Sequence, residues 1–107
     1  MRGAATVDHG LPTYAVDRLN TLFRQWPQIE AVILYGSRAM GNYRFASDID
    51  LCVEGESLGV QDLLKLDAAI DDLMLPWKVD LSLKHMIEDP DLLAHIERAG
   101  VPLYERG

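Results

Sequence analysis

Three aspartates occupy positions from which their carboxylates can meet in space. Asp48 and Asp50 lie in the alternating segment DIDLCVE (48–54), so both side chains project from one face of a predicted strand. Two carboxylates this close repel each other unless a positive charge lies between them. Asp80 falls on the polar face of a later alternating segment, WKVDLSLK (77–84), and converges on the same point if the two strands are neighbours. Such a set of carboxylates suits Mg²⁺, and paired metal ions recur in phosphoryl transfer.

A glycine–serine turn precedes the aspartate pair. Gly36 and Ser37 directly follow the apolar run VILY, and the residues after them can open a short helix. Backbone amides at such a turn bind anions, and glycine lets a phosphate approach the main chain. Ser37 adds a hydroxyl donor, and Arg38 adds a cationic fork. The sequence therefore predicts a phosphate cradle beside a metal site, which suits a nucleoside triphosphate with Mg²⁺.

Hydrophobic periodicity predicts the elements that must position these residues. Apolar residues recur at spacings of three and four over residues 11–26 and again over 60–73, which indicates two amphipathic helices. The short β-branched run EAVILY (30–35) is typical of a central strand. The alternating segments described above supply two further strands.

The C-terminal part of the sequence predicts a third helix and a last strand. Asp89 is a typical N-cap, Pro90 a typical first helical residue and Gly100 a typical stop. The tail VPLYER (101–106) reads as an edge strand because of Pro102. The expected fold class is α+β, a small mixed β-sheet with helices on one face.

Composition narrows the classes of function. We expect residues 1–107 to form a single domain. The chain has 17 acidic and 10 basic residues, a formal net charge of −7, so direct nucleic-acid binding is not expected. Cys52 is the only cysteine, and no apolar stretch is long enough to span a bilayer. The N-terminus lacks the apolar core of a signal peptide, and we expect a cytoplasmic protein with no membrane attachment.

The segment GSRAMGNYRFASDIDLCV (36–53) carries a resemblance to a known family. It resembles the signature of the DNA polymerase β-like nucleotidyltransferase superfamily, in which G-S is followed after about ten residues by D-x-D. Because no second domain is expected to follow, the chain most resembles the minimal nucleotidyltransferases that act as antitoxins beside HEPN-domain toxins. The resemblance extends from the first helix to the ERAGVPLYE segment (97–105) and implies a polymerase β-like nucleotidyltransferase fold.

The resemblance also implies roles for matching residues. Asp48 and Asp50 would bind Mg²⁺, with two ions expected, and Gly36 and Ser37 would hold the triphosphate of ATP. Asp80 matches the family's third carboxylate, which helps to activate the attacking hydroxyl. In the antitoxin family this hydroxyl belongs to a tyrosine of the partner HEPN toxin, which receives AMP with loss of pyrophosphate. The implied function is therefore a Mg²⁺-dependent protein adenylyltransferase that neutralises its toxin.

Some residues depart from the family pattern or lie outside it. Many relatives have a second basic residue where Met40 stands, and Arg44 can substitute for it in contacts with phosphate. His9, His85 and His95 have no ligand spacing with one another, so we interpret them as structural.

Two other functions remain open from the sequence. An antitoxin could neutralise its toxin by binding alone, although a relic enzyme would be free to lose Ser37 and the three aspartates. The chain could also transfer a nucleotide to a small molecule such as an aminoglycoside. Enzymes of that kind normally add a helical domain that completes the acceptor pocket.

Overall fold

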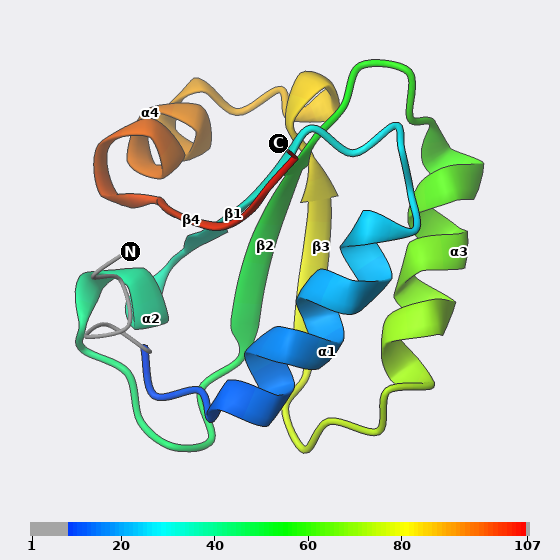
Figure 1. The fold of residues 1–107 in the computed structure, drawn as a ribbon. Coiled ribbons are helices and arrows are strands. Elements are labelled where there is room, and N and C mark those ends of the chain that lie inside the picture. Colours follow the sequence, from blue (N-terminus) through cyan, green and yellow to red (C-terminus); the bar gives the residue numbers. More distant parts are fainter. Residues whose placement is uncertain (1–8, 107) are drawn as a thin grey trace.

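A mixed four-stranded sheet organises the protein (Figure 1). The computed structural model describes residues 9–106. In chain order its elements are α1 (Thr13–Arg24), β1 (Ala31–Tyr35), α2 (Ser37–Met40), β2 (Ile49–Glu54), α3 (Val60–Asp71), β3 (Val79–Leu83), a 3₁₀ turn (Lys84–Met86), α4 (Pro90–Ala99) and β4 (Val101–Glu105). The predicted helices and strands are all present, with boundaries that differ by one to a few residues.

The strand order is β3-β2-β1-β4. β1 pairs antiparallel with both β2 and β4, whereas β2 and β3 run parallel and are joined by the crossover helix α3. β4 is an edge strand, as Pro102 predicts, because proline cannot donate a hydrogen bond to a further strand. The parallel pair makes β2 and β3 neighbours, which meets the condition that the sequence set for Asp80.

α1 and α3 cover one face of the sheet, and the main core lies between them (Figure 1). The stripe of α1 buries Ala15, Leu19 and Phe23 completely, at the spacing of three and four that the periodicity predicts. From α3, Leu66 and Ile70 join the same core, whereas Val60 at the start of that helix is exposed. Truncating a fully buried leucine such as Leu19 to alanine would cost about 2–5 kcal/mol, so this layer supplies much of the stability.

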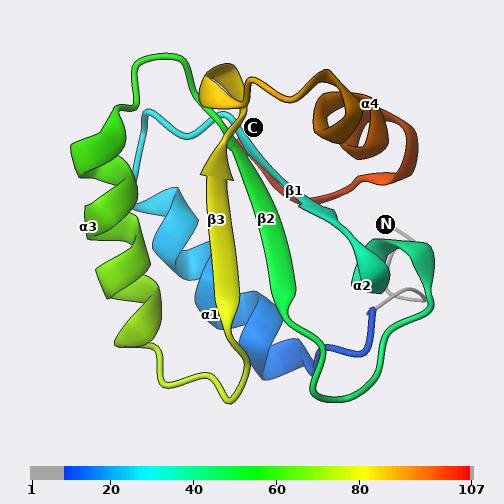
Figure 2. The same cartoon turned by 180° about the vertical axis from the view of Figure 1, so that it is seen from behind.

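α4 packs over β1 on the opposite face of the sheet. Ile96 of α4 forms a small second core with Tyr35 and Cys52, whose side chains point away from α1. The expected fold class is confirmed, and α1 and α3 lie on one face as expected, but α4 adds a partial cover to the other face. In Figure 2 no helix lies over β2 and β3 on that side. The uncovered part of this face is where the predicted site residues lie.

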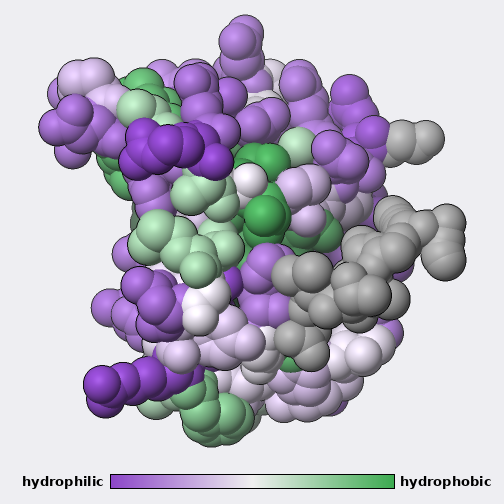
Figure 3. Space-filling view, turned by 90° about the vertical axis from the view of Figure 1, so that its left-hand side faces the viewer, coloured by the Kyte–Doolittle hydropathy of each residue, from purple (hydrophilic) through white to green (hydrophobic). Residues whose placement is uncertain are grey.

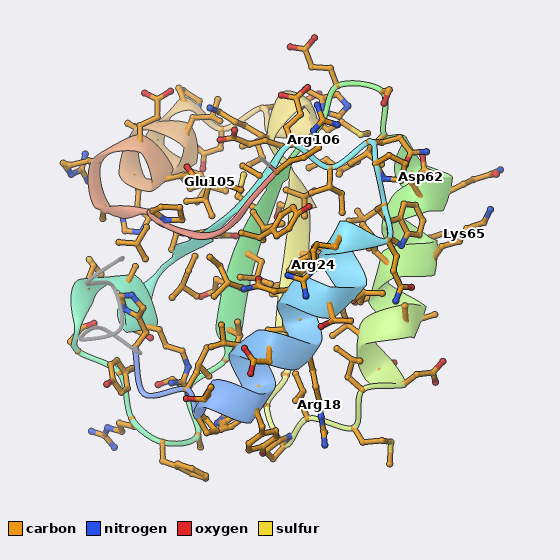
Figure 4. All side chains as sticks on the ribbon, viewed as in Figure 1. Arg18, Arg24, Asp62, Lys65, Glu105 and Arg106 are labelled. Atoms are coloured by element: carbon orange, nitrogen blue, oxygen red, sulfur yellow. The ribbon has the colours of Figure 1, made fainter. Side chains whose placement is uncertain are left out.

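Charged residues are distributed around the helical layer. Figure 4 shows Arg18 and Arg24 on α1, and Asp62 and Lys65 on α3. Asp62 caps its helix, because its Oδ2 accepts a hydrogen bond from the Gly59 amide at 2.8 Å. At the end of β4, the Arg106 side chain donates to the carbonyl of Pro27 and so ties the strand to the loop before β1. Over residues 9–106, the helices are too short or too polar to cross a membrane.

Candidate active site

Asp50 and Asp80 lie at one level of the sheet, on the face opposite α1. The parallel register pairs Asp50 of β2 with Asp80 of β3, and the antiparallel register pairs Asp50 with Tyr35 of β1. Paired residues on neighbouring strands project from the same face, so the two carboxylates and the phenol form one row. Asp48 comes just before β2 and is exposed. The sequence-predicted aspartates therefore belong to one region of the surface.

The electrostatic environment of Asp50 reflects this arrangement. Burial, and then the charges of Asp80 and Asp48, raise the pKa of the Asp50 carboxyl. The pKa of the neighbouring Tyr35 hydroxyl is also raised, mainly by burial, although a hydrogen bond from Ser82 opposes the shift. The negative charges of Asp48, Asp50 and Asp80 thus lie close enough together to affect one another's surroundings.

The donor chemistry of this row suits a hard divalent cation. Carboxylate oxygens are what Mg²⁺ prefers, and a cation beside Asp50 and Asp80 would remove the repulsion that raises the Asp50 pKa. The aspartates do not form a preformed metal site. Among the described residues, no three His, Cys, Asp or Glu side chains are grouped closely enough to hold a metal ion. The residues therefore fit Mg²⁺ by chemistry and by shared face.

Gly36 brings the main chain directly against Asp50. Its φ of +80° and ψ of −156° belong to a backbone region that only glycine adopts readily. A Cβ atom at Gly36 would lie 2.4 Å from Asp50 Oδ2, inside van der Waals contact. Glycine is therefore required at position 36 for two reasons: other residues do not readily adopt these backbone angles, and a side chain would clash with the Asp50 carboxylate.

Ser37 begins the short helix α2, as the sequence predicts for the residues after the turn. The carbonyl of Ser37 accepts a hydrogen bond from Asn42 N–H at 3.2 Å, which closes the turn of α2. Gly36, Ser37 and Asp50 are therefore held close together, at the point where β1 ends and β2 begins.

Arg38 does not take the part that the sequence predicts for it. The side chain was expected to offer a cationic fork to phosphate, but it is only 1% exposed. Its guanidinium donates to the carbonyls of His9 (2.7 Å), Phe45 (2.9 Å) and Ser47 (3.0 and 3.2 Å). A guanidinium whose donors are used in this way has little left for a ligand, so we assign Arg38 to holding the loop that leads into Asp48.

Trp77 holds the same loop from the side of β3. Its indole Nε1–H donates to the carbonyl of Phe45 at 2.8 Å, and its ring packs edge-on against the Phe45 ring. The Arg38 guanidinium lies over the Trp77 ring at 5.7 Å, in cation–π geometry. The loop 41–48 is therefore anchored by a buried cation and an aromatic ring, although its Phe45 side chain remains 76% exposed.

His95 is one of two residues in this region whose role the sequence analysis misses. Its Nε2 accepts a hydrogen bond from the Gly36 amide at 3.2 Å, and its ring meets Tyr35 edge-on. The two partners are 59 residues apart in sequence, so no local spacing could have revealed the contact. Trp77 is missed for the same reason, because its partner Phe45 is 32 residues away.

A separate cavity of about 420 Å³ lies at the other end of β2. Its lining includes four glutamates, Glu30, Glu54, Glu56 and Glu97, against the single ammonium of Lys84. Gly36, Ser37 and the three aspartates do not line this cavity, so it lies apart from the predicted phosphate and metal ligands. Figure 3 shows the side of the molecule that carries α2 and α4, where some hydrophobic residues reach the surface among hydrophilic ones. The aspartate row and the Gly36 turn remain the better candidate for a nucleotide site.

Comparison with known families decides between the possible assignments of this fold. The family described as polymerase beta, nucleotidyltransferase matches residues 17–107. The chain belongs to this nucleotidyltransferase family. The family-level resemblance drawn from the G-S…D-x-D segment is thereby confirmed. Among curated proteins, none matches the sequence.

Solved structures share the fold of this nucleotidyltransferase. A crystal structure of a toxin–antitoxin with AMP-PNP has a chain that matches with a TM-score of 0.70 and 22% identity over 85% of this chain and 73% of that one. A complex of the tri-AMPylated Shewanella oneidensis HEPN toxin with its MNT antitoxin matches with a TM-score of 0.66, 19% identity and coverages of 87% and 71%. A nucleotidyltransferase-like protein of Sulfolobus solfataricus matches with a TM-score of 0.60, 19% identity and coverages of 98% and 91%.

Proposed function

We propose that this nucleotidyltransferase transfers AMP from ATP to a tyrosine hydroxyl of a HEPN-type toxin and thereby neutralises it. The observation that carries the proposal is the pairing of Asp50 with Asp80 beside the Gly36 turn. The AMP-PNP complex and the AMPylated HEPN toxin named among the structures of the same fold support the choice of nucleotide and acceptor. We place the protein in the cytoplasm, with no membrane or direct nucleic-acid partner.

The residues divide the work of the proposed reaction. Asp48, Asp50 and Asp80 would hold Mg²⁺, with two ions expected, and Gly36 and Ser37 would contact the triphosphate. When bound, Mg²⁺ neutralises charge that develops on the phosphates. The tyrosine oxygen forms a bond to the α-phosphorus, the bond from that phosphorus to the bridging oxygen breaks, and pyrophosphate leaves. Asp80 receives the tyrosine proton, because a phenol with an ordinary pKa near 10 needs a base at neutral pH.

The deciding experiment is the intact mass of the toxin after incubation with this protein, ATP and Mg²⁺. The candidate toxin is the product of the neighbouring gene if that product is a small helical protein with an R-x4-6-H motif. We expect a mass increase of one or more AMP units with the wild type. We expect none with the Asp48→Asn, Asp50→Asn double variant.

A matched control keeps the result specific. The Asp67→Asn, Asp71→Asn double variant removes two exposed carboxylates from α3, the helix that packs on the other face of the sheet from the aspartate row. This control should transfer AMP at the wild-type rate. Full activity of the Asp48→Asn, Asp50→Asn variant would refute the assignment of the site. A stable complex without any mass increase would instead favour neutralisation by binding, and transfer to an aminoglycoside would favour the small-molecule alternative.

A further inference from the structure

The Gly36 turn is a point where the chain needs external support. Glycine loses more conformational freedom on folding than other residues. The backbone angles of Gly36 also lie in a region that only glycine adopts readily, so other contacts must hold the turn in this conformation. One constraint is local, because the Gly36 carbonyl accepts a hydrogen bond from Met40 N–H at 3.1 Å. The other constraint comes from outside the turn, and it is the hydrogen bond from the Gly36 amide to His95 Nε2 at 3.2 Å.

His95 is itself held firmly by α4. The next residue, Ile96, is 3% exposed and packs against Tyr35 and Cys52 in the second core. The His95 ring meets the Tyr35 ring at a centroid distance of 6.1 Å and an interplanar angle of 77°, an edge-to-face arrangement. The position of the imidazole is therefore fixed by the packing of the helix on the sheet.

The contact between Gly36 and Asp50 makes this support relevant to the site. Because Asp50 Oδ2 lies only 2.4 Å from the position that a Cβ atom of Gly36 would take, a small shift of the turn changes the space available to the carboxylate. The imidazole nitrogen that accepts the Gly36 hydrogen bond must be unprotonated, so the proton of the neutral ring lies on Nδ1. The distance between the Gly36 turn and the Asp50 carboxylate therefore depends on where the His95 ring lies and on which of its nitrogens carries the proton.

We infer that His95 is a positioning residue, which fixes the Gly36 turn against Asp50 and so sets the geometry in which nucleotide and metal are bound. This inference rests on the proposed function, because it concerns how the same site binds its nucleotide. His95 hydrogen-bonds to the Gly36 amide and packs on the Tyr35 ring, so we assign its effect to Gly36. Its consequence is that α4, on the second face of the sheet, is part of the nucleotide site.

Two substitutions separate the hydrogen bond from the packing of the ring. Glutamine can place an acceptor oxygen near the position of His95 Nε2, whereas phenylalanine keeps a ring against Tyr35 but has no acceptor. We expect His95→Gln to bind Mg²⁺–AMP-PNP within about threefold of the wild type, and His95→Phe to bind about tenfold more weakly, as for the loss of one hydrogen bond. Isothermal titration calorimetry measures both. His85→Phe is the matched control, because His85 Nε2 contacts Leu58 O at the other end of the sheet.

A second readout tests the hydrogen bond independently of nucleotide binding. In a ¹H–¹⁵N spectrum the Gly36 amide signal should move in His95→Phe, stay close to its wild-type position in His95→Gln and stay unchanged in His85→Phe. Wild-type affinity of His95→Phe would overturn the inference, as would a folded His95→Gln that binds as weakly as His95→Phe. Absence of nucleotide binding by the wild type would count against the proposed function, and an unmoved Gly36 signal in His95→Phe would still count separately against the role of His95.

Discussion

Asp50 of β2 faces Asp80 of β3 across the parallel strand pair, and both belong to the sheet face that α1 leaves uncovered. Two carboxylates in this relation cost stability when both are ionised, and among residues 9–106 neither of them forms an ion pair. The pair therefore makes the folded protein less stable than its core alone would allow. Carboxylates with raised pKa values often lie at functional sites, and this pair fits a site that binds a ligand.

The first prediction concerns the stability of Asp50→Asn. Burial and the neighbouring aspartates raise the pKa of Asp50, so the folded protein binds this proton more tightly than the unfolded chain does. Above the folded-state pKa the ionised carboxylate destabilises the protein, and Asn removes that cost. In EDTA, Asp50→Asn should be more stable than the wild type at neutral pH, and the difference should fade as the pH drops through the raised pKa. Urea unfolding over a pH series measures this, with Asp67→Asn expected within about 0.5 kcal/mol of the wild type.

Metal should reverse that order. A cation that binds the folded protein and not the unfolded chain raises the melting temperature by mass action. We expect Mg²⁺ with AMP-PNP to raise the Tm of the wild type and to leave the Asp48→Asn, Asp50→Asn variant nearly unchanged. Thermal scans with and without the pair of ligands provide the measurement. Equal shifts in both proteins would contradict the assignment of these carboxylates as ligands.

Removal of the buried guanidinium should weaken the loop before Asp48. Arg38→Met removes the guanidinium donors to the carbonyls of His9 and Ser47 and leaves Phe45 O with Trp77 alone. We therefore expect a loss of about 3 kcal/mol in the free energy of unfolding. Arg44→Met, an exposed change in the same loop, should cost no more than about 0.5 kcal/mol. Chemical denaturation of the two variants decides the matter, since similar losses would mean that burial of Arg38 carries no special weight.

Two glycines with similar φ values provide a matched pair. Gly36→Ala places a Cβ atom against Asp50 in a backbone region that is nearly exclusive to glycine, and should cost about 2–3 kcal/mol. Gly41 has a φ of +85° but open space around its Cβ position, so Gly41→Ala should cost only about 1 kcal/mol. Only the first change should also abolish AMP transfer. The comparison of unfolding free energies with transfer rates separates backbone strain from the approach to the carboxylate.

Cys52 should be unreactive in the folded protein. Burial, helped by the charge of Glu54, raises the pKa of its thiol to about 11, so the nucleophilic thiolate is scarce at neutral pH. We expect slow labelling by a thiol reagent under native conditions and fast labelling in denaturant. Mass spectrometry over a time course follows the reaction. Fast native labelling would show that the second core under α4 opens readily.

The sequence predicted what local chemistry determines. Periodicity located the helices and strands, and Asp89, Pro90 and Gly100 marked the last helix because caps and breakers act within a few residues. The approach of Asp80 to Asp50 could be stated only as a condition, since alternation shows which face a residue takes but not which strand lies beside it.

What the sequence could not predict depends on contacts between distant segments. The side chain of Arg38 turns inward to the carbonyls of residues 9, 45 and 47, and the first of these is 29 residues away in the sequence. His95 reaches Gly36 only because α4 crosses to the second face of the sheet. The G-S…D-x-D pattern lies within one short segment and could be recognised from the sequence, whereas the contacts of Arg38 and His95 that support this segment could not.

The position of β4 has a consequence for how the protein is made. β1 lies inside the sheet, between β2 and β4. β4, which covers the side of β1 away from β2, is the last of the four strands to be synthesised. Until β4 emerges, a nascent chain exposes the backbone of the apolar run AVILY as an open template for other chains. His95 lies on α4, which directly precedes β4, so the support of the Gly36 turn and the strand that covers this sheet edge emerge from the ribosome one after the other.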